Sequence, residues 1–451
     1  MSSDAEQEYF AEGISEEILN LLARIRELRV ISRSSAFALK GMNLEVPDIA
    51  ERLGVAHVLE GSVRKSGNMV RVTAQLIEAH TDTHLWSQTY DRELENLFAI
   101  QDEIAADVAS NLQIKLLSPL PRSRVVDPEV RALTQQASHV QELRQANLGQ
   151  NMQLLLDRAL AIDPDYVPAL ELMTYVPFFL ERDGVISSEE MDNRYAETKA
   201  KILSLDPENG FVDSGDAWDA AYRDKDLEKA AALFASSMRK DPADPNIMRL
   251  GGVFARHIGR MDDAVRILKH VVAIDPLCFQ CLYQLSRTYI YNGQYDEAMK
   301  TRTRYLASGG SGGQFHYSLI MLLQGEPEFG LQIVEELPFE GIQIDTSRAL
   351  ALFSLGDHDG AQAILDELLA SDDPDALGYA FELSAWMGQN DLTFEILASM
   401  GQNLPWMGNG DLFNPIYRNV REDPRWHDLR EALELSQERL DAINYVFELP
   451  E

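Results

Sequence analysis

The chain has 451 residues, a formal net charge of −33 and a hydrophobic content of 45%. This hydrophobic content excludes a wholly disordered chain, and the length favours two or more domains. The charge disfavours nonspecific binding to nucleic acids and to anionic membranes, because both carry negative groups. Two cysteines do not make a disulfide framework, no run of 18 apolar residues is present, and the first dozen residues lack the Lys or Arg of a signal peptide. As written, the sequence predicts a soluble chain that is not exported.

Residues 1–117 alternate between helical and β-like patterns, which predicts an α/β domain with a small mixed sheet. The expected elements are, in chain order, a helix over Glu8–Leu28, a β-like run over Arg29–Ser32, a helix over Val46–Leu53, a hairpin of His57–Lys65 and Met69–Ala79, a strand over His84–Tyr90 and a helix over Leu94–Leu117. The expected core residues recur at helical or alternating spacing: Ile14, Ile18, Leu21, Leu22 and Ile25 in the first helix, and Val70, Val72, Ala74 and Leu76 in the hairpin. A turn at Ser66, Gly67 and Asn68 joins the hairpin strands.

Six separated motifs of this domain occur in a fixed order. They are Glu8–Ile18 (EYFAEGISEEI), Val30–Ser35 (VISRSS), Gly54–Arg64 (GVAHVLEGSVR), His84–Trp86 (HLW), Tyr90–Arg92 (YDR) and Phe98–Ile104 (FAIQDEI). In this order they resemble a bacterial family, the TolB amino-terminal-like (FlgO-like) domain, over residues 1 to about 117. The resemblance implies tetratricopeptide repeats downstream. It also implies an upstream module, typically a class III nucleotide cyclase or a CadC-like winged-helix DNA-binding domain, often followed by one transmembrane helix.

The chain departs from that family at its start. The family domain normally opens with an apolar strand just before the segment that begins here at Met1, and the sequence lacks it. We therefore expect the sheet to expose an unpaired edge, through which two copies of the chain could form a homodimer. The cellular side stays open: the cytoplasm if Met1 is the true start, and the periplasmic side of the inner membrane if an upstream membrane helix belongs to the full protein.

Residues 118–128 carry three prolines and are expected to form an extended linker between domains. A second pattern then repeats with a period near 34 residues. With Lys225 aligned to Gly259, the repeats share a small residue five positions later, a large apolar residue nine positions later and an Asp-Pro pair at sixteen and seventeen; these are Ala230 and Ala264, Phe234 and Leu268, and Asp241–Pro242 and Asp275–Pro276. Later turn positions are Gly293, Gly325, Gly356 and Gly388, with the small-residue site at Ala298, Gly330, Ala361 and Thr393.

Each residue type of this pattern has a mechanical role in a helical hairpin. A glycine allows the sharp reversal between the helices, alanine lets their backbones approach, and proline ends the second helix. The pattern resembles the tetratricopeptide repeat (TPR), whose period is 34 residues. It predicts an all-α superhelix of about eight hairpins over residues 129–407, with the first two hairpins and the Gly330 unit irregular, and capping helices over residues 408–451.

Few residues suggest chemistry. The run Ser308–Gly313 is either a loop between repeats or a hinge, and Ser311 in its G-x-S-x-G lacks the preceding strand of a hydrolase. Cys278 and Cys281 form one C-x-x-C pair and are expected to pack as small residues, since zinc needs four ligands. His80 and His84, which flank Asp82, are expected in a surface turn. The sequence predicts no catalytic residue, no metal site and no cofactor.

The remaining candidate is a surface. The first helix of each TPR hairpin lines the concave groove, with repeat positions 2, 5, 9, 12 and 13 facing inward. Counted from Pro245 and Phe279, these positions are Asn246, Arg249, Val253, Arg256 and His257, then Gln280, Tyr283, Arg287, Ile290 and Tyr291. Arginine presents a fork that suits carboxylates, so this surface could bind an acidic or carboxylate-bearing peptide. The alternative, in which the arginines neutralise Asp and Glu within the solenoid, stays open. The chaperone-binding carboxylate clamp is not reproduced, since Val253 stands where that clamp has Asn.

These observations favour a non-enzymatic interaction scaffold or sensor module of a bacterial signalling protein. Two alternatives follow from the resemblance: the regulatory half of a class III adenylate or guanylate cyclase whose catalytic domain lies outside this chain, and the sensor region of a CadC-like transcriptional regulator. The expected partner is a protein or peptide, with an acidic one among the options, and neither nucleic acid binding nor membrane insertion of this chain is expected.

Overall fold

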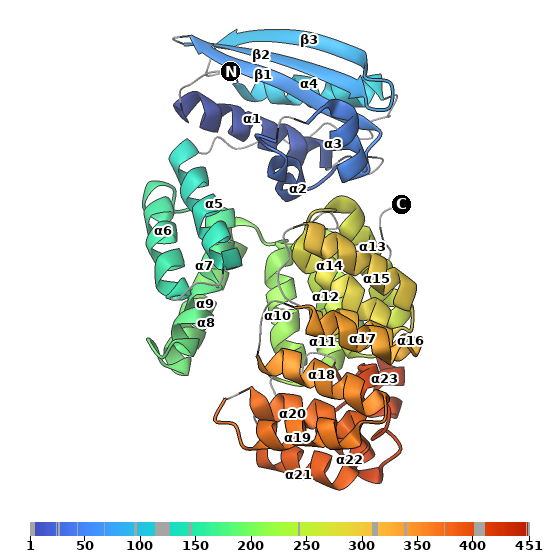
Figure 1. Cartoon of the computed structure of the whole chain (residues 1–451). Helices are drawn as coiled ribbons and strands as arrows, with labels where there is room; N and C mark the ends of the chain where they lie inside the picture. Colours follow the sequence, from blue (N-terminus) through green and yellow to red (C-terminus); the bar gives the residue numbers. More distant parts are fainter. Residues whose placement is uncertain are drawn as a thin grey trace. The chain divides into compact units, whose positions relative to one another are not determined.

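The computed structural model describes residues 5–23, 25, 28–42, 44–66, 68–93, 97–112, 127–143, 147–241, 244–308, 314–337, 341–373, 375–400, 411–447 and 449. The chain divides into two units (Figure 1). The first is built mainly from Met1–Gly215, and the second from Asp216–Met238 and Asp244–Leu449. Within the described ranges, no helix combines the length and apolar character needed to cross a bilayer.

The first unit opens with an α/β domain. Its elements are α1 (Ala5–Ala23), α2 (Arg33–Ala38), α3 (Val46–Leu53), β1 (His57–Ser66), β2 (Met69–Glu78), β3 (Thr83–Glu93) and α4 (Leu97–Asn111). The strands form a sheet of order β1-β2-β3 in which both pairs are antiparallel. The expectation of a mixed sheet is wrong for the described strands, which are all antiparallel. Short turns join consecutive strands here, and strands joined in this way run antiparallel. Helices α1 and α4 cover one face of the sheet (Figure 1).

The core of this domain is the one that the sequence pattern predicts. All five apolar residues of the first helical pattern, Ile14, Ile18, Leu21, Leu22 and Ile25, are buried, as are Val70, Val72, Ala74 and Leu76 of β2. The Tyr90 hydroxyl of β3 donates a hydrogen bond of 2.6 Å to Asp107 Oδ2 of α4. The sheet is thus fixed to its helices by apolar packing and by a polar contact.

A further expectation in this domain is corrected. Arg29–Ser32 is not a strand, because the segment leads into α2, where the Ser32 side chain caps the helix by accepting a hydrogen bond from Ser35 N. The helix expected over Leu94–Leu117 is found as α4 (Leu97–Asn111), and residues 94–96 and 113–117 lie outside the described residues. The hairpin turn is found where predicted, although Gly67 lies outside the described residues.

Helices α5 (Pro128–Leu143), α6 (Leu148–Ile162), α7 (Val167–Met173), α8 (Val176–Arg182) and α9 (Ser188–Leu205) complete most of the first unit. The expected linker falls largely on residues outside the described ranges, and Pro128, its last residue, is the first residue of α5. Prolines also stand at the starts of α7 and α8, where a missing N–H costs nothing. The hairpin in this part is irregular, because a short helix, α8, is inserted between α7 and α9.

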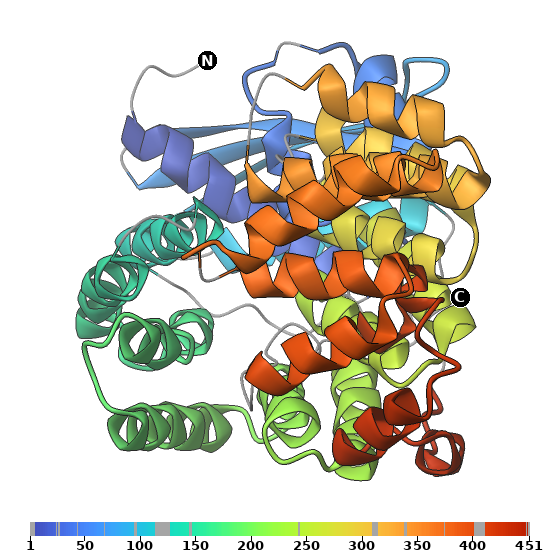
Figure 2. The same cartoon turned by 60° about the horizontal axis from the view of Figure 1, so that its bottom comes forward.

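Helix α10 (Gly210–Tyr222) runs across the division between the units, and the second unit continues with regular hairpins. Its helices are α11 (Leu227–Lys240), α12 (Pro245–His257), α13 (Met261–Ile274), α14 (Phe279–Tyr291), α15 (Tyr295–Ala307), α16 (Gln314–Gln324), α17 (Pro327–Glu335), α18 (Ile342–Ser354), α19 (His358–Leu369), α20 (Ala376–Trp386) and α21 (Asn390–Met400). Consecutive hairpins stack in sequence order from α12 to α21 (Figures 1 and 2).

The predicted repeat register is confirmed residue by residue. The turn positions Lys225, Gly259, Gly293, Gly325, Gly356 and Gly388 all have a positive φ. Lys225, a residue with a side chain, adopts the same left-handed conformation as its aligned Gly259, with φ of 57° and 77°. The small-residue positions Ala230, Ala264, Ala298, Gly330, Ala361 and Thr393 are all buried between the two helices of a hairpin. The turns and the close helix contacts therefore lie where the 34-residue period places them.

The end of the chain returns to the start of the second unit. It holds η3 (Asp411–Phe413), η4 (Pro415–Tyr417), α22 (Pro424–Ala432) and α23 (Gln437–Ala442). After α23, the buried Tyr445 hydroxyl donates to the carbonyl of Gly251 at 3.0 Å, and its ring lies 5.3 Å from that of Phe254. The Arg260 guanidinium donates to the carbonyl of Ile443 at 3.0 Å. This return to α12 was not predicted, because a tyrosine after the last helix carries no repeat signature.

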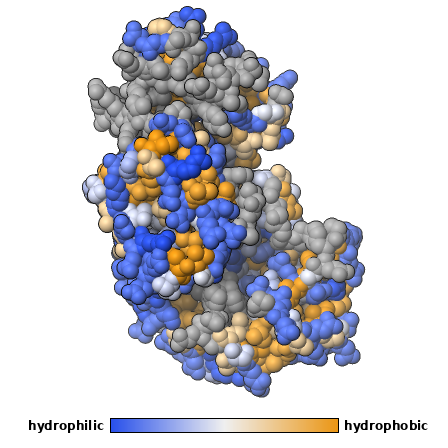
Figure 3. Space-filling view, turned by 90° about the vertical axis from the view of Figure 1, so that its left-hand side faces the viewer, coloured by the Kyte–Doolittle hydropathy of each residue, from blue (hydrophilic) through white to orange (hydrophobic). Residues whose placement is uncertain are grey.

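The face of the molecule seen in Figure 3 is mostly hydrophilic. On the face seen in Figure 3, hydrophobic side chains lie in small separate groups among hydrophilic ones. Single exposed apolar residues such as Leu154, Ile162 and Val185 are ordinary on a folded chain.

Candidate partner-binding site

The candidate site is built on α14. Tyr283, Arg287 and Tyr291 are spaced by four residues, so they form one stripe along the helix. Arg256 of α12, Arg302 and Tyr305 of α15, and His316 of α16 complete the group. These seven residues, named here the arginine–tyrosine cluster, all belong to the second unit.

Guanidinium groups and tyrosine rings alternate along the stripe. The Arg287 guanidinium lies 5.6 Å from the centre of the Tyr283 ring and 5.7 Å from that of Tyr291. It also donates a hydrogen bond of 3.0 Å to the Tyr291 hydroxyl. The guanidinium of Arg256, from α12, also lies over the Tyr291 ring, 5.5 Å from its centre. Cation–π contacts of this kind hold flat guanidinium groups in fixed orientations.

Arg256 is also held by polar groups of α14. Its Nη1 donates to Gln284 Oε1 at 3.0 Å and to Thr288 Oγ1 at 3.2 Å. The side chain is almost fully buried, with 1% of its surface exposed. Arg256 therefore ties α12 to α14 and holds Tyr291 in place.

Arg302 continues the alternation on α15. It is fully buried, and its guanidinium lies 4.2 Å from the ring centre of Tyr305 and 5.3 Å from that of Tyr283. Burial lowers the pKa of Arg302 from its usual value, because the charged form loses hydration. Two tyrosine faces thus surround a desolvated cation.

The pKa of His316 reflects the positive charge of the neighbouring arginines. Its ring lies 5.5 Å from that of Tyr283 in an edge-on arrangement. Burial is the first cause that lowers the pKa of His316 well below its usual range, and the charges of Arg302, Arg287 and Arg256 lower it further. The charges of three arginines therefore act together with burial to disfavour protonation of this histidine.

The composition around the cluster agrees with this. Residues 245–325 hold nine basic and five acidic side chains, a net charge of +4 in a chain whose net charge is −33. Such a stretch favours a negatively charged partner. Neighbouring tyrosines add contact area at low entropic cost.

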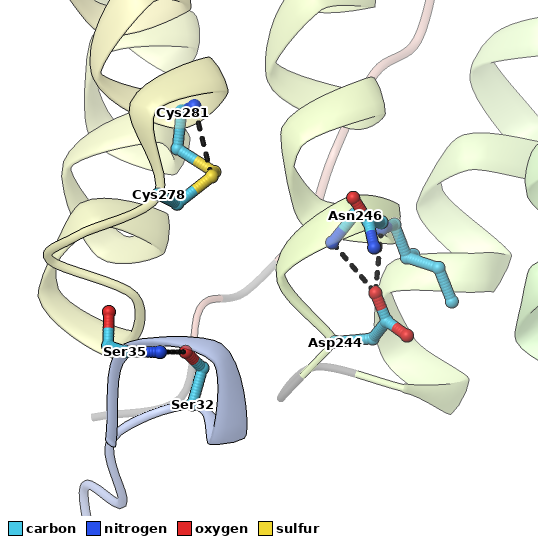
Figure 4. Close-up of a disulfide and its surroundings, with 7 residues drawn as sticks. Ser32, Ser35, Asp244, Asn246, Cys278 and Cys281 are labelled. Atoms are coloured by element: carbon cyan, nitrogen blue, oxygen red, sulfur yellow. Dashed lines mark hydrogen bonds between the residues drawn. A yellow bond between two sulfur atoms is a disulfide. The ribbon is translucent and has the colours of Figure 1, made fainter. Parts of the chain in front are cut away.

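The structure places the predicted site residues unequally. Asn246 is exposed on α12, next to the Asp244 carboxylate that caps this helix by accepting hydrogen bonds from Asn246 N at 2.7 Å and Ile247 N at 3.0 Å (Figure 4). Arg249 and Gln280 are half-buried. The side chains of Tyr283, Arg287 and Tyr291 are half-buried and come together in the cluster.

His257 is packed rather than presented. It is 3% exposed, and its ring lies 4.8 Å from that of Tyr222. Burial, followed by the charge of Arg256, lowers the pKa of His257 to about 3. Like Val253 and Ile290, it lies inside the fold.

Arg302, Tyr305 and His316 were not predicted, because groove positions were assigned only on α12 and α14, whereas these residues lie on α15 and α16. Arg302 carried a signal nonetheless. It stands nine residues after the turn Gly293, the position that holds Phe234 and Leu268 in the two preceding repeats. A charged residue at a repeat position that is otherwise apolar indicates a local requirement for charge.

The cysteines, the histidines around Asp82 and Ser311 are the other candidates for chemistry. Cys278 and Cys281 are joined by a disulfide bond, which corrects the expectation that they are two packed thiols. His80 and His84 are exposed around Asp82, as predicted for a surface turn. Ser311 and most of the run Ser308–Gly313 lie outside the described residues. Among the residues that are described, no group of three or more His, Cys, Asp or Glu could hold a metal ion.

A family model of the tetratricopeptide repeat matches residues 279–301, the hairpin that carries Tyr283, Arg287 and Tyr291. The repeat register and the fold together define the class of protein, in which a small α/β domain is followed by a TPR-type helical superhelix. The chain is 38% identical over 193 residues to a Rhizobium meliloti (strain 1021) protein named putative adenylate cyclase 3, and the match covers 41% of this chain and 32% of that protein. The chain therefore spans about a third of the length of this relative.

Solved structures of TPR proteins resemble the chain at low sequence identity. The type IV pilus biogenesis factor PilW is 16% identical with a TM-score of 0.32, and covers 55% of this chain and 94% of its own. A TPR protein from Parabacteroides merdae ATCC 43184 is 11% identical with a TM-score of 0.36, and covers 57% of this chain and 99% of its own.

Proposed function

We propose that the chain is a non-enzymatic protein-interaction module of a bacterial signalling protein, and that it binds an acidic or carboxylate-bearing peptide. In this proposal, the half-buried members of the arginine–tyrosine cluster form the contact surface together with Asn246, Arg249 and Gln280. Arg256 and His257 support that surface from below. The observation that carries the proposal is the alternation of guanidinium groups and tyrosine rings in an otherwise acidic chain.

Two physical arguments support this ligand class. A guanidinium held flat against a tyrosine ring keeps its outer N–H groups in a fork that matches a carboxylate. A half-buried site is screened less by salt than an exposed one, so each ion pair with the ligand contributes more. An acidic ligand also complements the net positive charge of residues 245–325.

The test is a titration of the full chain with a fluorescently labelled Asp- and Glu-rich peptide that ends in a free carboxylate. The variant Arg249→Ala/Arg287→Ala should weaken binding by at least tenfold, since two charge-assisted contacts are lost. The matched control is Arg158→Ala/Arg182→Ala, which removes the same charge from exposed positions of the first unit and should change affinity less than twofold. Equal affinities of the two variants would move the site elsewhere.

A second candidate function rests on the relative named putative adenylate cyclase 3. In that reading the chain is the regulatory half of a class III nucleotide cyclase, and residues 1–117 are a TolB amino-terminal-like domain between the catalytic part and the repeats. The chain alone, incubated with ATP and Mg²⁺ or Mn²⁺, should then form no cyclic AMP. Cyclic AMP formed by the purified chain would contradict both candidates, whereas formation that requires the upstream coding region would favour the second.

The α/β domain is also a proposed contact between two copies of the chain. Strands β1 and β3 are the outer strands of the described sheet, and an edge strand can pair with another chain. Size-exclusion chromatography should show a dimer that dissociates when an apolar strand is fused before Met1 so that it covers the sheet edge. A monomer that is unaffected by that strand would exclude this contact.

A further inference from the structure

The two cysteines of the chain form a disulfide at the start of a helix. Cys278 is the N-cap residue of α14, and Cys281 lies in its first turn, three residues later (Figure 4). The backbone N–H of Cys281 donates a hydrogen bond of 3.1 Å to Cys278 Sγ. The Cys278 sulfur is therefore placed where the backbone N–H groups of a helix terminus stabilise negative charge.

The two sulfur-bearing residues differ in their exposure. Cys281 is 1% exposed and faces the interior of the hairpin, whereas Cys278 is half-buried and lies at the boundary with the preceding turn. An incoming thiolate reaches the more accessible sulfur first. Cys278 is thus the residue attacked by an external thiolate. Cys281 is the residue whose sulfur leaves when the disulfide ring opens and attacks again when the ring closes.

The spacing argues against a purely stabilising bond. A disulfide stabilises mainly by restricting the unfolded chain, and this effect grows with the length of the loop that it closes. Here only Phe279 and Gln280 lie between the cysteines, so the bond restricts the unfolded chain little. A pair of cysteines at this spacing on a helix start is suited to reversible chemistry instead.

We propose that Cys278 and Cys281 form a thiol–disulfide exchange site that takes thiol reductants such as glutathione. A thiolate of the reductant attacks Cys278 Sγ and forms a mixed disulfide, while the Cys278–Cys281 bond breaks and its electron pair leaves as the Cys281 thiolate. A second reductant thiolate attacks the reductant sulfur of the mixed disulfide and releases the Cys278 thiolate. In total, two electrons pass from two reductant thiols to the chain, which gains two thiols, and the reductant becomes its own disulfide.

The site borders the arginine–tyrosine cluster without depending on its ligand. Gln280 lies inside the disulfide ring, and Tyr283 follows Cys281 by two residues on the same helix. Opening of the ring removes the covalent restraint on the first turn of α14, which carries Gln280. The redox state of the pair therefore decides whether one end of the proposed contact surface is covalently restrained.

The first test uses the unaltered full chain. It is equilibrated in glutathione buffers of increasing reducing strength, quenched with an alkylating reagent and analysed by peptide mass spectrometry. We expect reversible opening of the disulfide while the circular dichroism spectrum stays that of the folded chain. A bond that opens only when the chain unfolds would overturn the proposal.

The second test separates the two sulfurs. With oxidised glutathione, Cys281→Ser should form a mixed disulfide at Cys278 at least tenfold faster than Cys278→Ser forms one at the buried Cys281. A double variant, Cys278→Ser/Cys281→Ser, is the control for folding and for background labelling. Equal rates at the two positions would contradict the assigned roles. If either single variant fails to fold, brief alkylation of the reduced unaltered chain gives the same comparison, with Cys278 expected to be modified first.

Discussion

Two successive hairpins of the second unit have the same arrangement of helices but carry different kinds of residue at one buried repeat position. In the α12–α13 hairpin, the position nine residues after the turn holds Leu268, which is fully buried. In the α14–α15 hairpin, the same position holds Arg302, which is also fully buried but lies between the rings of Tyr283 and Tyr305. The repeat fold thus accepts a buried arginine at this position when neighbouring tyrosine rings contact its guanidinium. The difference locates the site, because a cation in a repeat core is costly unless its neighbours are adapted to it.

The strongest way to break this comparison is to give the first hairpin the residue of the second. Leu268→Arg places a guanidinium at a fully buried position that packs against Gly252 of α12. We expect a loss of more than about 4 kcal/mol in the free energy of unfolding, because the charge is buried without adapted partners. Urea unfolding followed by circular dichroism measures it.

Two variants bracket this first prediction. Leu268→Ala should cost about 2–5 kcal/mol through the cavity that it leaves. Leu154→Arg, at a position that is 65% exposed, should change stability by less than about 0.5 kcal/mol. A Leu268→Arg variant as stable as the unaltered chain would show that any hairpin of this superhelix accepts the cation.

The second prediction concerns acid. Because the folded chain lowers the pKa of His257 to about 3, the unfolded chain, with an ordinary histidine pKa near 6.5, binds the proton more readily between these values. Stability is therefore complete above about pH 6.5 and falls as the pH drops below it. At pH 5 the loss from this residue is about 2 kcal/mol.

The measurement is the free energy of unfolding at pH 7.5 and pH 5 for the unaltered chain and for His257→Gln. The variant should lose less stability between these pH values, since it has no proton to gain at this position. His427→Gln, at an exposed position of α22, is the matched control and should keep the pH dependence of the unaltered chain. Identical pH dependences for all three would contradict the buried, neutral state of His257.

Much of the architecture follows from the sequence because the repeat pattern reports local geometry. Turn residues must adopt a positive φ and small residues must separate two helix backbones, so both leave a mark every 34 residues or so. The core of the α/β domain is predictable for the same reason, as Val70 and Val72 alternate on one face of β2. The run Arg29–Ser32 was misread because β-like side chains make a strand only when a neighbouring strand pairs with them.

The site was predictable only in part. Tyr283 and Arg287 could be found because α14 carries them at groove positions of a known repeat. Arg302 and His316 reach the cluster from other helices, so their positions depend on tertiary packing that no local pattern records. The exposure of each groove residue was equally hidden. The return of Tyr445 to α12 joins residues 194 positions apart, which sequence periodicity does not report.

The third prediction sharpens the comparison at the turns. Gly293 has φ of 69° and open space around its Cα, so Gly293→Ala measures backbone strain alone and should cost about 1 kcal/mol. Lys225→Gly should bring a gain of similar or smaller size, since it removes a side chain from the same conformation. Gly259→Ala should cost more than Gly293→Ala, because its new methyl group would also meet the Phe413 ring. Thermal unfolding of the three variants ranks them, and a Gly293→Ala variant without any loss would contradict the left-handed turn.

The smallest effect on stability is expected for substitution of the buried Arg302. Arg302→Leu gives the second hairpin the residue of the first, and it exchanges the cost of a desolvated cation for apolar burial. Such exchanges are often neutral or stabilising, so we expect the free energy of unfolding to change by less than about 1 kcal/mol or to rise. Affinity for the acidic peptide should nevertheless fall about tenfold, because the positive potential at Tyr283 and His316 is reduced. A stable variant that binds unchanged would assign Arg302 to packing alone, whereas a stable variant with weakened binding would show that the hairpin keeps a buried cation for its ligand rather than for its fold.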